Sequence, residues 1–241
     1  MIVSWFSAGV SSAVATKIMI NEIDKIIYTH IDDQHPDSMR FVGDCEQWFG
    51  KEIEIMQSHY KTAEAAWRAS GLHRPNTPQG APCTRLLKRR VRAEWEMDKT
   101  DLTYIWGFDI EEKDRAERIV ENMRKQRHLF PLIDKSISKK HAHEILSASG
   151  IKRPVMYDLG YNNNNCVGCL KASSKGYWNH IRIDFPDVFE RRAKAERVIG
   201  GSIIKDKNGN PLYLDELNPN EGRHTPPIID DCGIFCELMA I

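Results

Sequence analysis

The chain lacks net charge and long apolar runs. Its 241 residues contain 34 Lys plus Arg and 34 Asp plus Glu, and 41% of the residues are hydrophobic. A balanced charge gives no reason to expect a nucleic-acid or membrane-surface partner, and no stretch approaches the roughly 20 apolar residues of a membrane span. No secretory leader pattern precedes the first apolar run, and no internal repeat is visible. We therefore expect a cytoplasmic protein with its own core and no membrane partner.

Short apolar runs alternate with helical patterns along the first part of the chain. Runs at residues 2–6, 25–31, 52–56 and 102–108 predict strands, and patterns at 10–22, 37–49, 60–70, 83–96 and 112–125 predict helices. This alternation predicts an α/β domain over residues 1–150, with a doubly wound, mostly parallel sheet. Residues 151–241 are predicted to form a cysteine-bearing C-terminal extension, with a helical stretch at 174–198 and a turn at 205–211 between two short strands.

The segment at residues 7–12, Ser-Ala-Gly-Val-Ser-Ser, joins the first strand to the first helix. Small residues permit close approach of a ligand, and a helix start directs free N–H groups and partial positive charge at it. A phosphate or sulfate is the natural occupant. The alternative is an ordinary strand-to-helix turn. Asp32 and Gly107 follow two other predicted strands, so they belong to the same edge of the sheet.

Six cysteines in a reducing compartment indicate metal binding or reactivity. Cys166 and Cys169 form a Cys-x-x-Cys turn, the arrangement that tetrahedral zinc and iron–sulfur clusters need. The tail pair, Cys232 and Cys236, either completes such a site or packs as small buried hydrophobes. Cys45 is expected in the core.

Two further segments carry cationic groups that suit an anion. Cys83 stands at a predicted helix start with Arg85 and Lys88 nearby, which would lower the pKa of its thiol. Arg115 follows the strand that ends near Gly107, where a guanidinium could bind an anion bidentately. The alternative for Arg115 is a solvated helix with Glu–Arg pairs.

In their order, these motifs resemble the phosphoadenylyl-sulfate (PAPS) reductase family, within the adenine-nucleotide α-hydrolase (ATP pyrophosphatase, PP-loop) superfamily. The loop at 7–12 is similar to Ser-Gly-Gly-x-Asp-Ser, and residues 83–88 are similar to Cys-x-x-x-Leu-Lys. Residues 107–115 resemble the Gly…Glu…Arg segment, and 130–133 resemble the Asn-Pro-Leu element. Residues 156–169 resemble Tyr-x-x-Gly-Tyr…Cys-x-x-Cys, and 231–235 resemble the Glu-Cys-Gly-Leu-His tail.

The resemblance implies an oxidoreductase of sulfur metabolism that binds an adenine nucleotide sulfate (PAPS or adenylyl sulfate, APS) and reduces it to sulfite through a cysteine thiosulfonate. It implies Cys232 as the nucleophile, Lys88 and Arg115 as catalytic clamps on the sulfonate, and thioredoxin-like thiols as the reductant. The nucleotide-binding residues that we expect are Ser7, Ala8, Gly9, Ser11, Ser12, Asp32, Arg85 and Gly107. The expected ligands of zinc or a [4Fe–4S] cluster are Cys83, Cys166, Cys169 and Cys236.

Departures from the family pattern keep two other hypotheses open. Ser11 replaces an aspartate that could help hold Mg²⁺. Ala8 replaces a glycine, and this replacement is tolerated only if φ stays negative, so we expect a negative φ at Ala8. The first alternative is an ATP-dependent adenylating enzyme for sulfur or nitrogen transfer, with Mg²⁺ and a nucleic-acid acceptor such as a nucleobase. The second is a non-enzymatic nucleotide-binding module with structural zinc. A homo-oligomer is expected under each.

Overall fold

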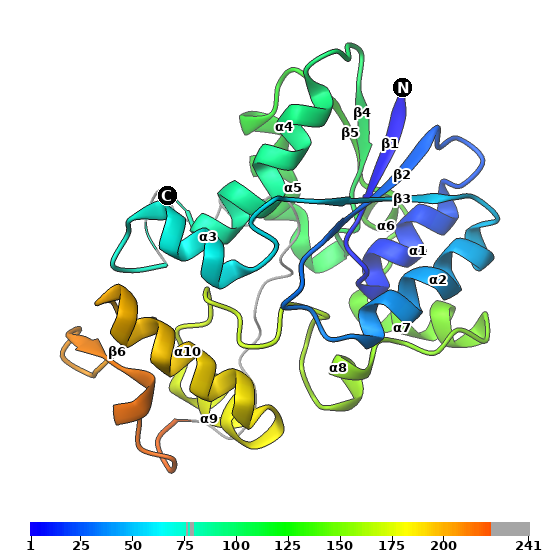
Figure 1. Ribbon diagram of the computed structural model, residues 1–241. Helices are drawn as coiled ribbons and strands as arrows, with labels where there is room; N and C mark the ends of the chain where they lie inside the picture. Colours follow the sequence, from blue (N-terminus) through cyan, green and yellow to red (C-terminus); the bar gives the residue numbers. More distant parts are fainter. Residues whose placement is uncertain (76, 78–79, 223–241) are drawn as a thin grey trace.

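A five-stranded sheet forms the centre of the molecule in the computed structural model, which describes residues 1–75, 77 and 80–222. All four strand pairings are parallel, and the order across the sheet is β3-β2-β1-β4-β5 (Figure 1). The strands are β1 (Ile2–Phe6), β2 (Lys25–His30), β3 (Ile53–Gln57), β4 (Thr103–Ile105) and β5 (Arg127–Leu129). The predicted parallel α/β sheet is confirmed.

Helices cover both faces of this sheet. One face packs against α1 (Val10–Ile18), α2 (Asp37–Phe49), α6 (Pro131–Asp134) and α7 (Lys139–Ala148). The other face packs against α4 (Arg90–Glu96) and α5 (Lys113–Asn122). Successive strand residues serve opposite faces, so Phe6 joins the first core while Val3 and Trp5 join the second. This two-sided cover is what a doubly wound fold requires.

The strand order fixes where the direction of winding changes. The chain passes outward from β1 through β2 to β3, and then returns to the other side of β1 as β4. The crevice between the carboxyl ends of β1 and β4 is therefore the topological switch point, where open α/β sheets bind their ligands.

A third apolar cluster lies outside the sheet and joins parts of the chain that are distant in sequence. It contains residues from α3 (Ala63–Ser70), the π-helix η1 (Thr84–Arg89), α8 (Val155–Asp158), α9 (Lys175–Asp184) and α10 (Pro186–Ile199). Two short antiparallel strands, β6 (Ile204–Lys205) and β7 (Pro211–Leu212), confirm the predicted turn between strands. The short helices η2 (Ile110–Glu112) and η3 (Leu214–Glu216) complete the described elements.

Several predicted boundaries differ from the structure. The stretch predicted as one helix at 174–198 is two, because Pro186 occupies the first turn of α10 and cannot continue α9. The strand predicted at 102–108 is shorter and covers only Thr103–Ile105 (β4). The helix predicted at 83–96 begins as the π-helix η1 and continues as α4.

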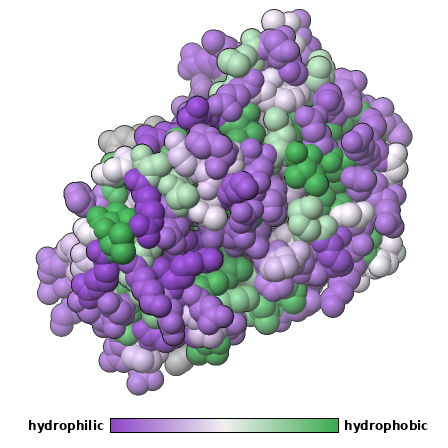
Figure 2. All heavy atoms as spheres, viewed as in Figure 1, coloured by the Kyte–Doolittle hydropathy of each residue, from purple (hydrophilic) through white to green (hydrophobic). Residues whose placement is uncertain are grey.

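Among the described residues, no helix has the length and apolar character to span a membrane. The face seen in Figure 2 is mostly hydrophilic, with apolar residues in separate groups.

Candidate nucleotide site at the switch point

The β1–α1 loop, residues 7–12, lies at the carboxyl end of the central strand. Two of its backbone N–H groups have protein partners: that of Ser7 donates to Ser12 Oγ (3.0 Å), and that of Val10 donates to the Tyr157 hydroxyl (3.3 Å). Within the described part of the chain, the N–H groups of Ala8, Gly9, Ser11 and Ser12 have no hydrogen-bond partner. All four residues are buried. The first N–H groups of a helix have no intrahelical partner, so the N–H groups of these buried residues are available to an acceptor.

Ala8 has a left-handed backbone, and the expectation of a negative φ was wrong. Its φ is +59°, and the residue is fully buried. For an alanine this conformation costs roughly 1–2 kcal/mol, because Cβ approaches the following carbonyl oxygen. The Ala8 carbonyl accepts a hydrogen bond from Asn164 Nδ2 at 2.9 Å. Asn164 belongs to the run of four asparagines, which sequence reasoning treated only as a loop.

Gly107 lies against the start of α1, as its predicted place at the same sheet edge requires. A Cβ added to Gly107 would lie 2.5 Å from the Ser12 Cα atom. Real Cβ contacts do not come so close, so any side chain at residue 107 would displace the β1–α1 loop. The structure therefore brings together the loop and Gly107, both predicted to bind the nucleotide.

The two aspartates after β2 have different surroundings. Asp32, the predicted ligand residue, is exposed, and its Oδ1 accepts a hydrogen bond from Gln57 Nε2 at 2.6 Å. Asp33 is buried and accepts a hydrogen bond from the Ala63 N–H at 2.6 Å. Asp33 also forms ion pairs with Arg192 (2.8 Å) and Arg191 (3.2 Å). The sequence placed both acids at this edge but chose Asp32 as the binding residue, and it gave no sign of Arg192, because no local pattern marks a partner 159 positions away.

The Cys-x-x-Cys segment, residues 166–169, is attached beside the end of β2. Cys166 pairs with Gln34 in an isolated antiparallel bridge, and the Val167 N–H donates to the Asp33 carbonyl at 2.8 Å. Arg192 Nε donates to the Gly168 carbonyl at 3.2 Å. These contacts place the cysteines at the same sheet edge as the β1–α1 loop.

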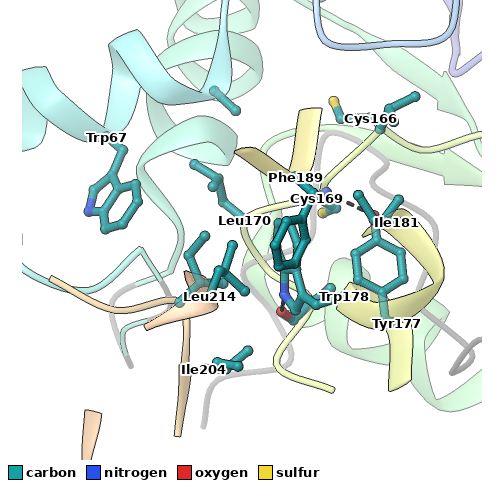
Figure 3. Packing of buried hydrophobic residues seen from close by; sticks show 14 of the residues in the cluster. Trp67, Cys166, Cys169, Leu170, Tyr177, Trp178, Ile181, Phe189, Ile204 and Leu214 are labelled. Carbon is teal, nitrogen blue, oxygen red and sulfur yellow. Dashed lines mark hydrogen bonds between the residues drawn. The ribbon is translucent and has the colours of Figure 1, made fainter. Parts of the chain in front are cut away.

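Three of the predicted metal ligands share the third apolar cluster. Cys166 and Cys169 are buried among aromatic side chains such as Tyr177 and Trp178 (Figure 3), and the half-buried Cys83 packs against the same cluster. The Cys169 N–H donates to the Tyr177 hydroxyl at 2.9 Å. Burial, followed by the electrostatic interaction with Cys169, raises the pKa of Tyr177 well above its usual value.

The described residues supply sulfur donors but not a complete metal site. No group of three or more His, Cys, Asp or Glu side chains within residues 1–75, 77 and 80–222 is arranged to hold a metal ion. The predicted ligand Cys236 and the predicted nucleophile Cys232 lie outside the described residues. Zinc or an iron–sulfur cluster therefore stays a prediction that needs a sulfur from the tail. Cys45 is fully buried in the core, as predicted, and burial raises the pKa of its thiol.

The predicted cationic clamps differ in environment. Arg85 is exposed and Lys88 is half-buried on η1, and neither side chain forms an ion pair or hydrogen bond with another described residue. Arg115 is buried: its Nη1 donates to Glu112 Oε1 at 2.7 Å, and its guanidinium lies 4.4 Å from the Phe108 ring centroid. The alternative, a solvated helix with Glu–Arg pairs, is therefore right about the pair and wrong about Arg115 being solvated. Arg115 is already paired, and an anion would have to compete with Glu112.

The chain matches no protein-family model and no curated protein sequence.

Proposed function

We propose that this protein is an enzyme that binds an adenine nucleotide sulfate on the β1–α1 loop and reduces it to sulfite, as the PAPS reductase family does. One observation carries the proposal: four buried residues at the start of α1, at the topological switch point of the sheet, have backbone N–H groups without described partners. Such groups, together with the positive end of a helix dipole, favour a phosphate or sulfate over a neutral ligand.

The proposed chemistry is a transfer of the sulfonate to a cysteine. The Cys232 thiolate attacks the sulfate sulfur, the bond between that sulfur and the bridging phosphate oxygen breaks, and the nucleotide monophosphate leaves. A thiol of a thioredoxin-like dithiol then attacks the Cys232 sulfur, sulfite departs with the electron pair of the S–S bond, and the resulting mixed disulfide is resolved by the second thiol. Each turnover oxidises one dithiol to a disulfide and reduces the sulfate sulfur to sulfite.

The carboxylates near the loop favour a nucleotide sulfate over Mg²⁺–ATP. Mg²⁺ in nucleotide sites is usually held by one or two carboxylates together with the phosphates. Ser11 supplies none. Asp33 is buried in its ion pair with Arg192, and Asp32 is hydrogen-bonded to Gln57. A nucleotide sulfate needs no such metal.

A substitution that removes one N–H from the loop tests the binding site. Proline is tolerated in the first turn of a helix, so Ser11→Pro deletes the Ser11 N–H, whereas Ser11→Ala keeps it and serves as the matched control. A hydrogen bond to a charged group contributes about 1.5–3 kcal/mol. We expect Ser11→Pro to weaken binding of adenylyl sulfate roughly 10- to 100-fold in calorimetry, and Ser11→Ala to weaken it less than about threefold. Equal affinities for both variants would refute the loop as the anion site.

Turnover assays separate the three hypotheses. Sulfite release with reduced thioredoxin supports the reductase, and Cys232→Ser should abolish this release while the nucleotide still binds. Pyrophosphate release from ATP, in the presence of an acceptor, would instead support the adenylating enzyme. Nucleotide binding without any turnover, together with one bound zinc whose chelation unfolds the protein, would support the structural module.

A further inference from the structure

Asn164 occupies a buried position between two elements that the sequence separates widely. The residue is 3% exposed. Its Nδ2 donates to the Ala8 carbonyl at 2.9 Å, and its amide atoms lie 3.1 and 3.2 Å from the Ser38 hydroxyl of α2. Ser38 is itself 1% exposed. The amide is therefore fixed on α2 at one side and bound to the β1–α1 loop at the other.

The Ala8 carbonyl belongs to the same rigid peptide unit as the Gly9 N–H. In a trans peptide the C=O and N–H point in opposite directions, and the unit is planar. A side chain that fixes the carbonyl thus fixes the direction of the N–H. The Gly9 N–H is one of the four that have no partner among the described residues.

This peptide unit follows Ala8, whose backbone is left-handed. An alanine seldom adopts that conformation. The φ of +59° persists only where the surroundings stabilise it. Loss of the Asn164 hydrogen bond would let Ala8 relax to a negative φ, and the Ala8–Gly9 peptide would rotate. The direction of the Gly9 N–H would then change with it.

We propose that Asn164 is a positioning residue that holds the Ala8–Gly9 peptide in its anion-binding orientation. The inference rests on the proposed binding of a nucleotide anion at the loop. Asn164 also stands two positions before Cys166, so the segment that carries the cysteines and the loop that receives the anion are directly connected.

The test compares Asn164→Ala in two backgrounds, with Ala8 and with Ala8→Gly. Glycine adopts positive φ without the Cβ penalty, so it should keep the loop geometry when Asn164 is lost. We expect Asn164→Ala to weaken adenylyl sulfate binding about tenfold with Ala8, but only about twofold with Ala8→Gly. The difference of roughly fivefold corresponds to the lower limit of the left-handed penalty, at 1.4 kcal/mol per tenfold change.

Asn163→Ala is the matched control. Asn163 is the buried neighbour of Asn164, and its Oδ1 accepts a hydrogen bond from Lys139 Nζ rather than from a group of the loop. We expect its affinity for adenylyl sulfate to stay within about threefold of that of the unmodified protein. A purely structural role of Asn164 would lower stability without any rescue of affinity by Ala8→Gly, and that result would overturn the proposal.

A ligand-free measurement keeps this inference separate from the proposed function. If the unmodified protein binds no adenine nucleotide, the proposed function fails. The unfolding free energies of four proteins then decide whether Asn164 holds the loop: the unmodified protein, Asn164→Ala, Ala8→Gly and the double variant. A smaller destabilisation by Asn164→Ala in the Ala8→Gly background supports the positioning role, and strictly additive effects overturn it. The Gly9 amide resonance should shift in Asn164→Ala and return toward its original position in the double variant.

Discussion

Arg191 and Arg192 pair with the same carboxylate, yet their burial predicts very different contributions to stability. The Arg192 side chain is 0% exposed and lies 2.8 Å from Asp33 Oδ1, whereas the Arg191 side chain is 53% exposed and lies 3.2 Å from the same atom. Arg192 also lies 3.6 Å from Glu64 Oε2. Replacement by methionine removes the charge and keeps an unbranched apolar chain, so the two variants form a matched pair.

The expected magnitudes follow from solvent exposure. Removal of one partner of a buried ion pair costs about 3–5 kcal/mol when the other charge stays buried without compensation. Asp33 keeps the exposed Arg191 and the Ala63 N–H as partners, so the lower end of this range, about 3 kcal/mol, applies to Arg192→Met. An exposed pair contributes about 0–1 kcal/mol. For a chain of this size, 1 kcal/mol shifts the melting temperature by roughly 2–4 °C. Arg192→Met should therefore lower Tm by roughly 6–12 °C, and Arg191→Met by less than about 4 °C.

Thermal unfolding followed by circular dichroism measures both shifts. The double variant Asp33→Asn/Arg192→Met is expected to be more stable than Arg192→Met alone, since the asparagine oxygen still accepts from the Ala63 N–H and no lone charge remains buried. Equal Tm values for Arg191→Met and Arg192→Met would refute the reasoning. So would a double variant as unstable as the sum of its two single changes.

Two further predictions concern the sheet edge. Gly107→Ala should destabilise the protein by about 1–3 kcal/mol, because the added Cβ meets Ser12. Gly43→Ala in α2 is the control: its added Cβ meets nothing within 4 Å, so it should stabilise the protein by about 0.5–1 kcal/mol. Equal changes in the unfolding free energy of the two variants in urea would contradict this prediction. Burial, followed by neighbouring carboxylates, raises the pKa of Asp109 from 3.8 to about 7. Because the folded state keeps a proton that the unfolded state has released, this carboxyl should lower stability as pH rises from about 4 to about 7. The Asp109 side chain accepts a hydrogen bond from the Glu111 N–H at the start of η2, and Asp109→Asn keeps an oxygen that can accept it. In denaturation experiments this variant should lose less stability between pH 5 and pH 7 than the unmodified protein. Equal losses for the two proteins would count against the prediction.

The sequence predicted the elements better than it predicted their ends. The alternation of β-branched runs and helical patterns was enough for the parallel sheet, because each pattern repeats with the period of its element. The helix at residues 37–49 is confirmed in full as α2. The break before Pro186 was visible in the sequence as a proline signal, but the apolar positions on both sides continued a helical pattern.

The candidate site also has a part that the sequence predicts and a part that it does not. The β1–α1 loop and Gly107 follow strands that pair side by side, so parallel topology alone brings them to one edge. The contacts that complete the arrangement come from residues far along the chain. Asn164 reaches Ala8, and Tyr157 reaches the Val10 N–H, through packing of α8 and the asparagine run against that edge. No periodicity encodes which of the four consecutive asparagines reaches the Ala8 carbonyl.

The sequence by itself determined the layered α/β architecture and the place of a small-residue loop before the first helix, because both depend on local periodicity and on chain order. Only the tertiary structure decided that Ala8 is left-handed, that Arg192 is buried while Arg191 is exposed, and that Arg115 is buried. Those outcomes depend on burial and on partners brought from distant segments, and burial determines how strongly each charge and each N–H group acts.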